Sequence, residues 1–225
     1  MLFRRGLQHW GRQLGAAAMN IINPRVSDDL RSGKKLRLNL GAGGADAEGR
    51  YAVDHLELPG VDIVADLNSA LDDLPDDSVS EIVTSHTFEH VENLMGLMHE
   101  IHRVVAPDGS ISIVVPHFSS TLAYSDPTHV RFFGLYTMGY FADAQDQPET
   151  RHVPNFYTAL RFRIESVQIH FYEWGTPLRR RLGRFMTRFW NKSAKRQHFY
   201  ECHLAYLYPA DEIWWILSPK KPAAD

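Results

Sequence analysis

The sequence contains little that would indicate a secreted or membrane-spanning protein. Its only cysteine, Cys202, excludes an internal disulfide framework and favours a reducing compartment. No run of about 18 apolar residues is present, so we expect no membrane-spanning helix. Internal repeats and low-complexity tracts are also missing. These absences favour a globular protein of the cytoplasm.

The composition suits a single hydrophobic core, but the charge is unevenly distributed. The chain has 225 residues, 44% of them hydrophobic, and separate cores become usual only at about 250–300 residues. The net charge is −3, yet residues 41–100 hold 14 acids and one base, and residues 175–200 hold eight bases and no acid. This asymmetry indicates either an anionic partner near the second segment or a solvated helix face.

Hydrophobic periodicity predicts strands that alternate with helices and loops. The continuous apolar run at 111–115 is typical of a strand buried on both faces, and a helical stripe covers residues 89–105. Such alternation indicates an α/β fold with a mainly parallel sheet. We expect strands at 36–40, 51–54, 61–65, 80–85, 111–115, 162–172 and 212–217, helical segments at 89–105 and 179–207, and a turn at 107–109.

A ligand site is predicted where the first of these strands ends. Strand 36–40 runs into Gly41-Ala42-Gly43-Gly44, where glycine allows a ligand to approach the backbone. Ligands of open α/β sheets bind beyond the carboxyl ends of the strands. Asp54 and Asp66 end the next two strands, where carboxylates can accept hydrogen bonds from ribose hydroxyls and an adenine amino group. Turn and cap roles are the alternative interpretation of each residue.

NAD fits this pattern poorly. Its fingerprint requires a third glycine where the sequence has Asp46, and a full helix before the acid that binds the ribose. Neither feature is present. An acid beside the glycine turn would also repel a pyrophosphate.

Several motifs resemble, in order and spacing, those of the class I S-adenosylmethionine-dependent methyltransferases. Leu38-Asn39-Leu40-Gly41-Ala42-Gly43 resembles their first motif, and residues 74–86 resemble their fourth-strand segment. Residues 87–91 and 102–109 continue the similarity, which covers residues 36–118 in all. The resemblance implies a Rossmann-like sheet of about seven strands with helices on both faces, and a methyltransferase that uses S-adenosyl-L-methionine.

The resemblance also implies which residues hold this cofactor. The glycine turn would lie beside the methionine part of the cofactor. Asp54 would bind the ribose, and Asp66 with Leu67 would bind the adenine. Ser85 and His86 would line the pocket below the sulfonium. The implied set is Leu40, Gly41, Ala42, Gly43, Asp54, Asp66, Leu67, Ser85 and His86.

One departure from the family is a loop at 45–49 in place of the first helix. A compact subgroup with a shortened first helix looks like this and often lies near cell-surface polysaccharide functions. Residues 125–133 and 201–220 also resemble segments of that subgroup. The similarity implies a small-molecule or saccharide acceptor, which can be lipid-linked.

Three histidines are candidates for a catalytic base. Methyl transfer requires alignment of acceptor and methyl group, and an alcohol acceptor also needs a base that works near neutral pH, which suits histidine. His90, His117 and His129 each lie near the ligand-binding end of the expected sheet. A structural or capping role is the alternative for each of them.

The pattern His86-x-x-Glu89-His90 is similar to two metal-binding motifs. Inverted zinc proteases carry it within one helix, whereas here it spans a strand end and a helix start. Some quinone and RNA methyltransferases hold magnesium or manganese through a Glu-x-x-Glu-His at this place, where this chain has His86 instead of the first glutamate. We therefore expect no metal.

Residues after Pro116 are expected to recognise the acceptor, because the cofactor motifs end near residue 118. Residues 117–133 are dense in polar groups, which fits a site better than a linker. We assign acceptor binding to Asp126, Arg131, Arg180 and Arg184, and expect the acceptor to be anionic.

Two other functions remain open. An RNA methyltransferase would hold phosphates with the basic segment 179–196 and stack bases on its aromatic residues. Those aromatics share a helical stripe with Leu182 and Met186, which favours core packing, so nucleic acid is the weaker prediction. A non-catalytic partner protein would bind S-adenosylmethionine but have no productive acceptor site.

The N-terminal part is expected to be a basic segment. Residues 1–27 have four arginines and no acid, and Phe3, Leu7, Trp10 and Leu14 recur at helical spacing. The interpretations are a helix over the cofactor pocket, peripheral contact with the inner membrane surface, or a transit peptide, which the scarcity of serine disfavours. We divide the chain into a basic amphipathic helix region at 1–35 and one methyltransferase domain at 36–225, with a basic helical insertion around 175–208.

Overall fold

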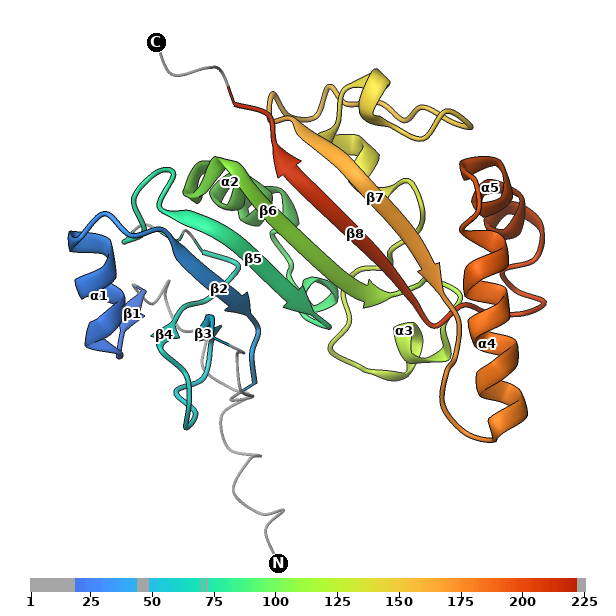
Figure 1. Ribbon diagram of the computed structural model, residues 1–225, viewed down its shortest axis with the longest axis horizontal. Helices are drawn as coiled ribbons and strands as arrows, with labels where there is room; N and C mark the ends of the chain where they lie inside the picture. Colours follow the sequence, from blue (N-terminus) through green and yellow to red (C-terminus); the bar gives the residue numbers. More distant parts are fainter. Residues whose placement is uncertain (1–18, 44–48, 70, 72, 222–225) are drawn as a thin grey trace, which may run out of the picture.

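The computed structural model describes residues 19–43, 49–69, 71 and 73–221. Its centre is an eight-stranded sheet in the order β1-β4-β3-β2-β5-β6-β8-β7 (Figure 1). Neighbours from β4 to β6 pair in parallel, and β1, β8 and β7 are joined by antiparallel pairing. The expected mainly parallel sheet is confirmed. The strands are β1 Asn20–Ile21, β2 Leu36–Leu40, β3 Tyr51–Asp54, β4 Ile63–Val64, β5 Val79–Ser85, β6 Val105–Pro116, β7 Phe162–His170 and β8 Glu212–Pro219.

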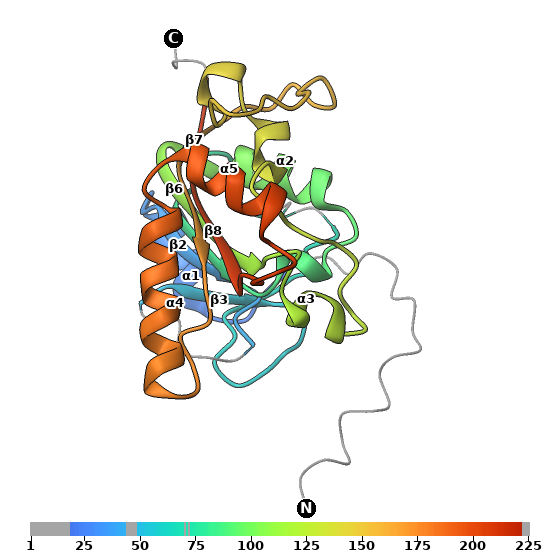
Figure 2. The ribbon, with the colours of Figure 1, turned by 90° about the vertical axis from the view of Figure 1, so that its right-hand side faces the viewer.

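Helices cover both faces of the sheet. Helix α4 (Pro177–Trp190) lies on one side and α2 (Leu94–Val104) on the other (Figure 2). The remaining helical elements are α1 Pro24–Arg31, α3 Thr121–Ser125, α5 Ala194–His203 and the 3-10 turns η1 Phe88–His90, η2 Thr137–Phe141 and η3 Ala144–Asp146. Among the described residues, no helix combines the length and apolar character needed to cross a bilayer.

The core is built on the middle of the sheet. Strand β6 pairs with β5 on one edge and β8 on the other, and Ile111, Ile113 and Val115 are completely buried. On β8, Trp215 is buried whereas its neighbour Trp214 is exposed, because successive side chains of a strand point to opposite faces. The parallel strands β2, β3 and β5 therefore end along one edge of a well-packed sheet, where the site lies.

The helix expected at 89–105 is shorter than the sequence predicts. Residues 88–90 form the separate turn η1, and α2 begins only after Asn93, whose side chain accepts a hydrogen bond from the Gly96 amide. The Asn68 side chain accepts from the Glu92 and Asn93 amides and so separates the two elements. This break places His90 at the end of η1, ahead of α2.

Three further expectations are corrected. The turn expected at 107–109 lies inside β6, where the register against β5 shifts between Val79 and Glu81. The helical segment expected at 179–207 is two helices, α4 and α5, because Asn191 bonds through its side chain to both backbone groups of Ile169. The strand expected at 61–65 is reduced to β4.

The N-terminal basic helix falls mostly outside the described residues, since residues 1–18 are not among them. Of the region 1–35, the structure shows β1 and α1. Helix α1 begins with Pro24 after the capping residue Asn23. The proposed boundary at residue 35 therefore stays a prediction.

Candidate active site

The glycine turn after β2 has the backbone that its sequence suggests. Gly41 and Gly43 have φ values of 71° and 59°, in the left-handed region that favours glycine. A Cβ on Gly41 would lie 2.1 Å from Oγ1 of Thr87, whose hydroxyl lies 3.2 Å from the carbonyl oxygens of Leu40 and Ser85. At Gly43, no atom of the described residues lies within 4 Å of the position that a Cβ would take. The turn thus packs tightly against the end of β5 and leaves room for a ligand on its other side.

Asp54 at the end of β3 is buried, with 6% of its surface exposed. Its Oδ2 accepts a hydrogen bond from the Gly43 amide at 2.8 Å, and its Oδ1 accepts from the Leu56 amide at 3.0 Å. Each carboxylate oxygen has two acceptor positions. Nδ1 of His55 also lies 3.1 Å from Oδ1, so among the described residues it is Oδ2 that retains a position for a ribose hydroxyl. Asp54 therefore shapes the turn and also fits the role of a ribose ligand.

Asp66 and Leu67 follow β4 on the adenine side of the expected site. Oδ1 of Asp66 accepts from the backbone and side-chain amides of Asn68 at 2.9 and 3.2 Å. Among the described residues Oδ2 has no such partner, and it remains available to an amino group. This arrangement also matches the turn role considered for Asp66, so both interpretations are compatible with the geometry.

His86 lies just beyond the end of β5, after the exposed Ser85, between two carboxylates. Its Nε2 is 2.9 Å from Oε1 of Glu212, and its Nδ1 is 3.4 Å from Oε1 of Glu89. Glu212 and then Glu89 raise the pKa of His86 to about 10, against the opposing effect of burial. His86 is therefore an imidazolium at neutral pH. Its φ of 53° is also unusual for a residue with a side chain.

A pocket of about 450 Å³ opens beside His86, and the loop 121–129 forms its other wall. It contains Asp126, His90 and His129, three of the residues assigned to catalysis or acceptor binding. The lining residues are His86, Glu89, His90, Pro116, Leu122, Ser125, Asp126, Pro127 and His129.

Glu89 is the ionisable residue of this pocket to which the sequence analysis gave no role. It is 1% exposed, and within the described part of the chain neither of its carboxylate oxygens has a hydrogen-bond partner. Its neighbours are His86 and His129, whose Nε2 lies 3.9 Å from Oε1 of Glu89. A buried carboxylate is costly unless a cation compensates it, and the ring of His86, whose pKa is raised, lies 3.4 Å away. Its only sequence signal was its place between His86 and His90.

The hydrogen bonds of His90 and His129 fix the tautomers of these two rings. Nδ1 of His129 lies 3.0 Å from the Ala123 carbonyl and must donate to it. The Thr128 hydroxyl donates to Asp126, so Nδ1 of His90, 2.8 Å from that hydroxyl, must donate as well. In their neutral forms both rings therefore keep a lone pair on Nε2. Each histidine can accept a proton there.

Arg131 fixes the loop that carries His129. Its Nε donates to the Val91 carbonyl at 2.7 Å, and its terminal nitrogen donates to the Glu92 carbonyl. The Val130 amide donates to the Glu89 carbonyl at 2.8 Å. The guanidinium assigned to the acceptor thus holds the loop against η1.

His117 lies apart from this pocket. It is completely buried, with Nδ1 2.8 Å from the Ser119 hydroxyl and Nε2 3.2 Å from Oε2 of Glu201. Both ring nitrogens are engaged within the fold. This geometry favours the structural role considered for His117, and we leave it out of the proposed base.

The basic residues of α4 are also away from this pocket. Arg180 and Arg184 are exposed and line neither of the two pockets described here. Arg179 lines a second pocket of about 260 Å³, which Tyr172 and Trp174 share. Helix α3 separates the pockets, since Thr121 lines the second and Leu122 lines the first.

A metal ion would find three suitable ligands here. One ligand atom from each of Glu89, His90 and His129 lies within 4.8 Å of the others. The sequence motif suggested His86 as a ligand instead, but Glu212 engages that ring. A metal at this cluster would lie next to the imidazolium of His86, which disfavours a second cation.

One family model matches part of this chain. Residues 45–113 match the family model described as "Methyltransferase domain". No curated protein matches the sequence significantly. Similar solved structures include a SAM-dependent methyltransferase from Archaeoglobus fulgidus, with 18% identity, 87% of this chain and 91% of that chain covered, and a TM-score of 0.48.

Two other solved structures are similar over most of this chain. For the YcgJ protein from Bacillus subtilis the identity is 17%, the coverage is 88% of this chain and 98% of that chain, and the TM-score is 0.46. Phosphoethanolamine N-methyltransferase 2 from Haemonchus contortus was solved in complex with S-adenosyl-L-methionine. Its identity to this chain is 14%, the coverage is 88% of this chain and 52% of that chain, and the TM-score is 0.45.

Proposed function

We propose that this class I S-adenosylmethionine-dependent methyltransferase methylates a hydroxyl group of an anionic small molecule or saccharide. The family match over residues 45–113 and the ordered motifs support such an enzyme, with S-adenosylmethionine as its cofactor. The observation that supports the acceptor is the buried Glu89 beside two histidines whose Nε2 atoms are free to accept a proton. Alcohols need such a base, whereas amines often do not.

The residues of this chain divide the reaction into positioning and proton transfer. S-adenosylmethionine, when bound, supplies a methyl group activated by positive sulfur. The open space at Gly43 and the buried carboxylate of Asp54 fit its methionine and ribose parts. The acceptor oxygen forms its bond to the methyl carbon as the bond from carbon to sulfur breaks, which leaves S-adenosylhomocysteine.

His129 is the base we favour, with His90 beside it. The acceptor proton passes to Nε2 of His129, and Glu89 then stabilises the imidazolium. His90 packs edge-on against His129, with ring centroids 4.7 Å apart. The chain of Asp126, Thr128 and His90 keeps this neighbour in one orientation.

The second pocket supports an anionic acceptor. The Arg179 guanidinium lies 4.3 Å from the ring centroid of Trp174 and 5.2 Å from that of Tyr172. This stacking holds the cation at the pocket wall. A phosphate or carboxylate of the acceptor would bind there while its hydroxyl group reaches the first pocket across α3.

Turnover measurements test this proposal. With sugar phosphates and hydroxylated acids offered as acceptors, we expect S-adenosylhomocysteine release by the wild type. His129→Ala should lower turnover by about 10²–10⁴-fold, the usual contribution of a general base, without loss of cofactor affinity. His152→Ala, at an exposed histidine, is the control. Full turnover in His129→Ala would refute the assignment.

The alternative of a non-catalytic binding protein gives a different result. It predicts cofactor binding with no methyl transfer to any acceptor class. The RNA alternative predicts transfer to RNA and binding that weakens steeply with salt. Neither accounts for the paired histidines around Glu89.

A further inference from the structure

Helix α4 carries three separate stripes of side chains along its length. One stripe packs against the protein, one is basic, and one is apolar yet exposed. A solvent-facing apolar stripe is unusual on a globular protein and marks an interaction surface when it is contiguous.

The packed stripe fixes how α4 is rotated. Gly183 is buried, and a Cβ there would lie 2.1 Å from the Tyr172 carbonyl oxygen. The Thr187 hydroxyl accepts a hydrogen bond from the Phe171 amide at 3.1 Å. Met186 and Trp190, both partly buried, pack on the hydrophobic core. The outward direction of the other residues follows from these contacts.

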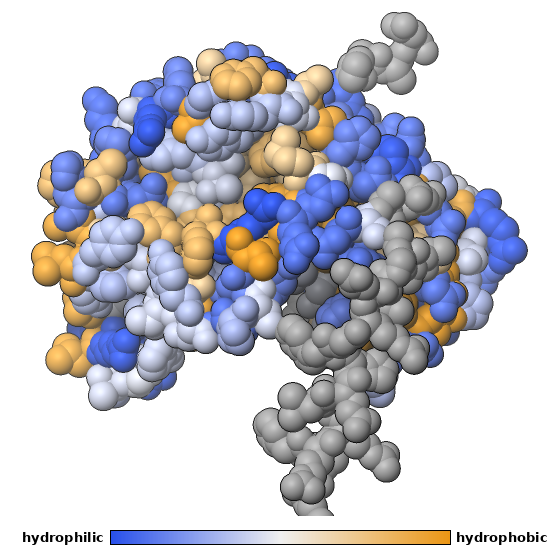
Figure 3. Space-filling view, turned by 180° about the vertical axis from the view of Figure 1, so that it is seen from behind, coloured by the Kyte–Doolittle hydropathy of each residue, from blue (hydrophilic) through white to orange (hydrophobic). Residues whose placement is uncertain are grey.

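The exposed apolar stripe consists of residues at helical spacing. Leu178, Leu182 and Phe185 are 79%, 43% and 60% exposed. The Phe189 ring stacks on Phe185 with a centroid distance of 5.8 Å and extends the stripe by one turn. Seen from behind, hydrophobic and hydrophilic residues are interspersed along the left-hand edge of the molecule, on the side where α4 and α5 lie (Figure 3).

The basic stripe lies beside it on the same helix. Arg180, Arg181, Arg184 and Arg188 are all exposed, and α4 contains no acidic residue. Within the described part of the chain, no carboxylate forms an ion pair with any of them. Their charge is therefore available to an external anion.

We propose that α4 docks on an anionic lipid membrane and lies in the plane of its surface. An exposed apolar stripe flanked by arginines is the arrangement of interfacial helices. The apolar side chains enter the boundary between headgroups and acyl chains, and the arginines bind lipid phosphates. Charge complementarity thus selects anionic over neutral lipid.

Docking would also bring the second pocket to the membrane. Arg179 belongs to α4, and Trp174, just ahead of the helix, is exposed. An acceptor with a lipid anchor would then present its anionic group next to Arg179. This consequence rests on the proposed function, whereas the docking itself does not.

The test is flotation of the full chain with vesicles of phosphatidylcholine alone or with 30% phosphatidylglycerol. We expect binding to the mixed vesicles only. Arg180→Glu combined with Arg184→Glu should weaken it by at least about 25-fold, because each basic residue near such a surface contributes about fivefold. Leu182→Gln combined with Phe185→Gln should also weaken it. The matched control is Arg25→Glu combined with Arg31→Glu on α1, where both residues are exposed.

Three results would overturn the proposal. The first is binding of both α4 variants equal to that of the wild type. The second is equal binding to neutral vesicles, or none to either kind. The third is release from mixed vesicles by a short single-stranded RNA, which would assign α4 to nucleic acid. Calorimetry with S-adenosylhomocysteine confirms that each variant is folded, and lost cofactor binding in the wild type would instead count against the proposed function.

Discussion

At the scale of single residues, the site is governed by contacts between carboxylates and histidines. His86 lies between Glu89 and Glu212, and Asp126 orients His90 through Thr128. The same residue types at exposed positions would titrate independently. Here their properties depend on one another, so single substitutions should have effects beyond the loss of one contact.

Asp54 gives the first expectation at this scale. Asp54→Ala should weaken S-adenosylhomocysteine binding by about 1.5–3 kcal/mol, the range for hydrogen bonds to a charged group. Isothermal calorimetry measures the loss. Asp54→Asn, which keeps an oxygen for the Gly43 amide, separates the ribose contact from the shape of the turn. Unchanged affinity in both variants would remove Asp54 from the cofactor site.

The protonation of His86 should appear in the pH dependence of stability. Its pKa is raised from 6.5 to about 10 by Glu212 and Glu89. The stabilisation from its charge is therefore complete below about pH 6.5 and is lost as the pH rises through 10. Urea unfolding should show a stability gap between wild type and His86→Gln that narrows from pH 6 to pH 10. A gap that stays constant over this range would contradict the charged pair.

Chelation tests whether the cluster of Glu89, His90 and His129 holds a metal. We expect turnover to survive dialysis against EDTA, because the imidazolium of His86 already compensates Glu89 at 3.4 Å. The measurement is S-adenosylhomocysteine release before and after dialysis. Loss of turnover with recovery on addition of magnesium, manganese or zinc would identify a metal centre instead.

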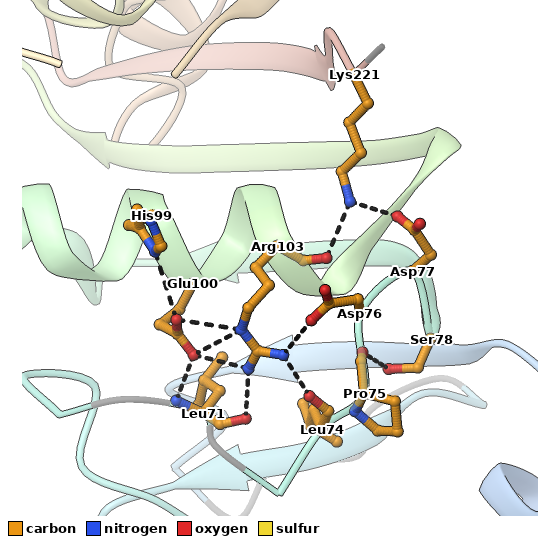
Figure 4. Close-up of polar contacts among 10 residues, drawn as sticks. All are labelled: Leu71, Leu74, Pro75, Asp76, Asp77, Ser78, His99, Glu100, Arg103 and Lys221. Atoms are coloured by element: carbon orange, nitrogen blue, oxygen red, sulfur yellow. Dashed lines mark hydrogen bonds and ion pairs between the residues drawn. The ribbon is translucent and has the colours of Figure 1, made fainter. Parts of the chain in front are cut away.

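At the scale of elements, Arg103 holds the end of α2 against the segment 71–78. Its guanidinium donates to the carbonyls of Leu71 and Leu74 and pairs with Glu100 (Figure 4). Lys221, after β8, donates to the Arg103 carbonyl from the other side (Figure 4). Arg103, which lies in a segment that resembles a methyltransferase motif, thus has a structural function here.

Arg103→Lys should destabilise the protein although it keeps the charge. A lysine ammonium cannot reach two carbonyls and a carboxylate in the planar geometry of a guanidinium. We expect a loss of about 1–3 kcal/mol in the free energy of unfolding, since polar groups lose their partners. Urea denaturation measures it, and the exposed Arg25→Lys should change it by less than about 0.5 kcal/mol. Equal effects of the two variants would show that Arg103 is dispensable.

At the scale of the whole molecule, ligand binding should be visible as stability. S-adenosylhomocysteine at 100 times its dissociation constant should stabilise the fold by about 2.7 kcal/mol. For a chain of this length the melting temperature should rise by about 5–10 °C. NAD at the same concentration should cause no shift. A comparable shift with NAD would contradict the cofactor assignment.

The cofactor side of the molecule could be predicted from the sequence because its signals are local. Gly41 and Gly43 follow a strand, and Asp54 and Asp66 follow the next two, so hydrophobic periodicity is enough to place them on one edge of a parallel sheet. The same periodicity predicted seven of the eight strands. It missed β1, whose two residues are too few to show a pattern.

Side-chain bonds that cross the fold explain where the elements differ from their sequence pattern. Asn68 separates η1 from α2, and Asn191 separates α4 from α5. In both cases an amide side chain satisfies backbone groups that a longer helix would have used. Such bonds depend on segments far apart in the chain, which periodicity does not record.

The acceptor side depends on contacts of the same kind. The sequence named His90, His117 and His129 equally, but only the fold brings His90 and His129 to Glu89 and buries His117 between Ser119 and Glu201. Glu212 is 126 positions away from His86 in the sequence. It reaches His86 because β8 pairs antiparallel with β6 and therefore begins at the edge of the sheet where β5 ends. Local patterns assign a residue to an element and an edge, whereas its charge, tautomer and partners are set by the long-range packing that carries other elements to that edge.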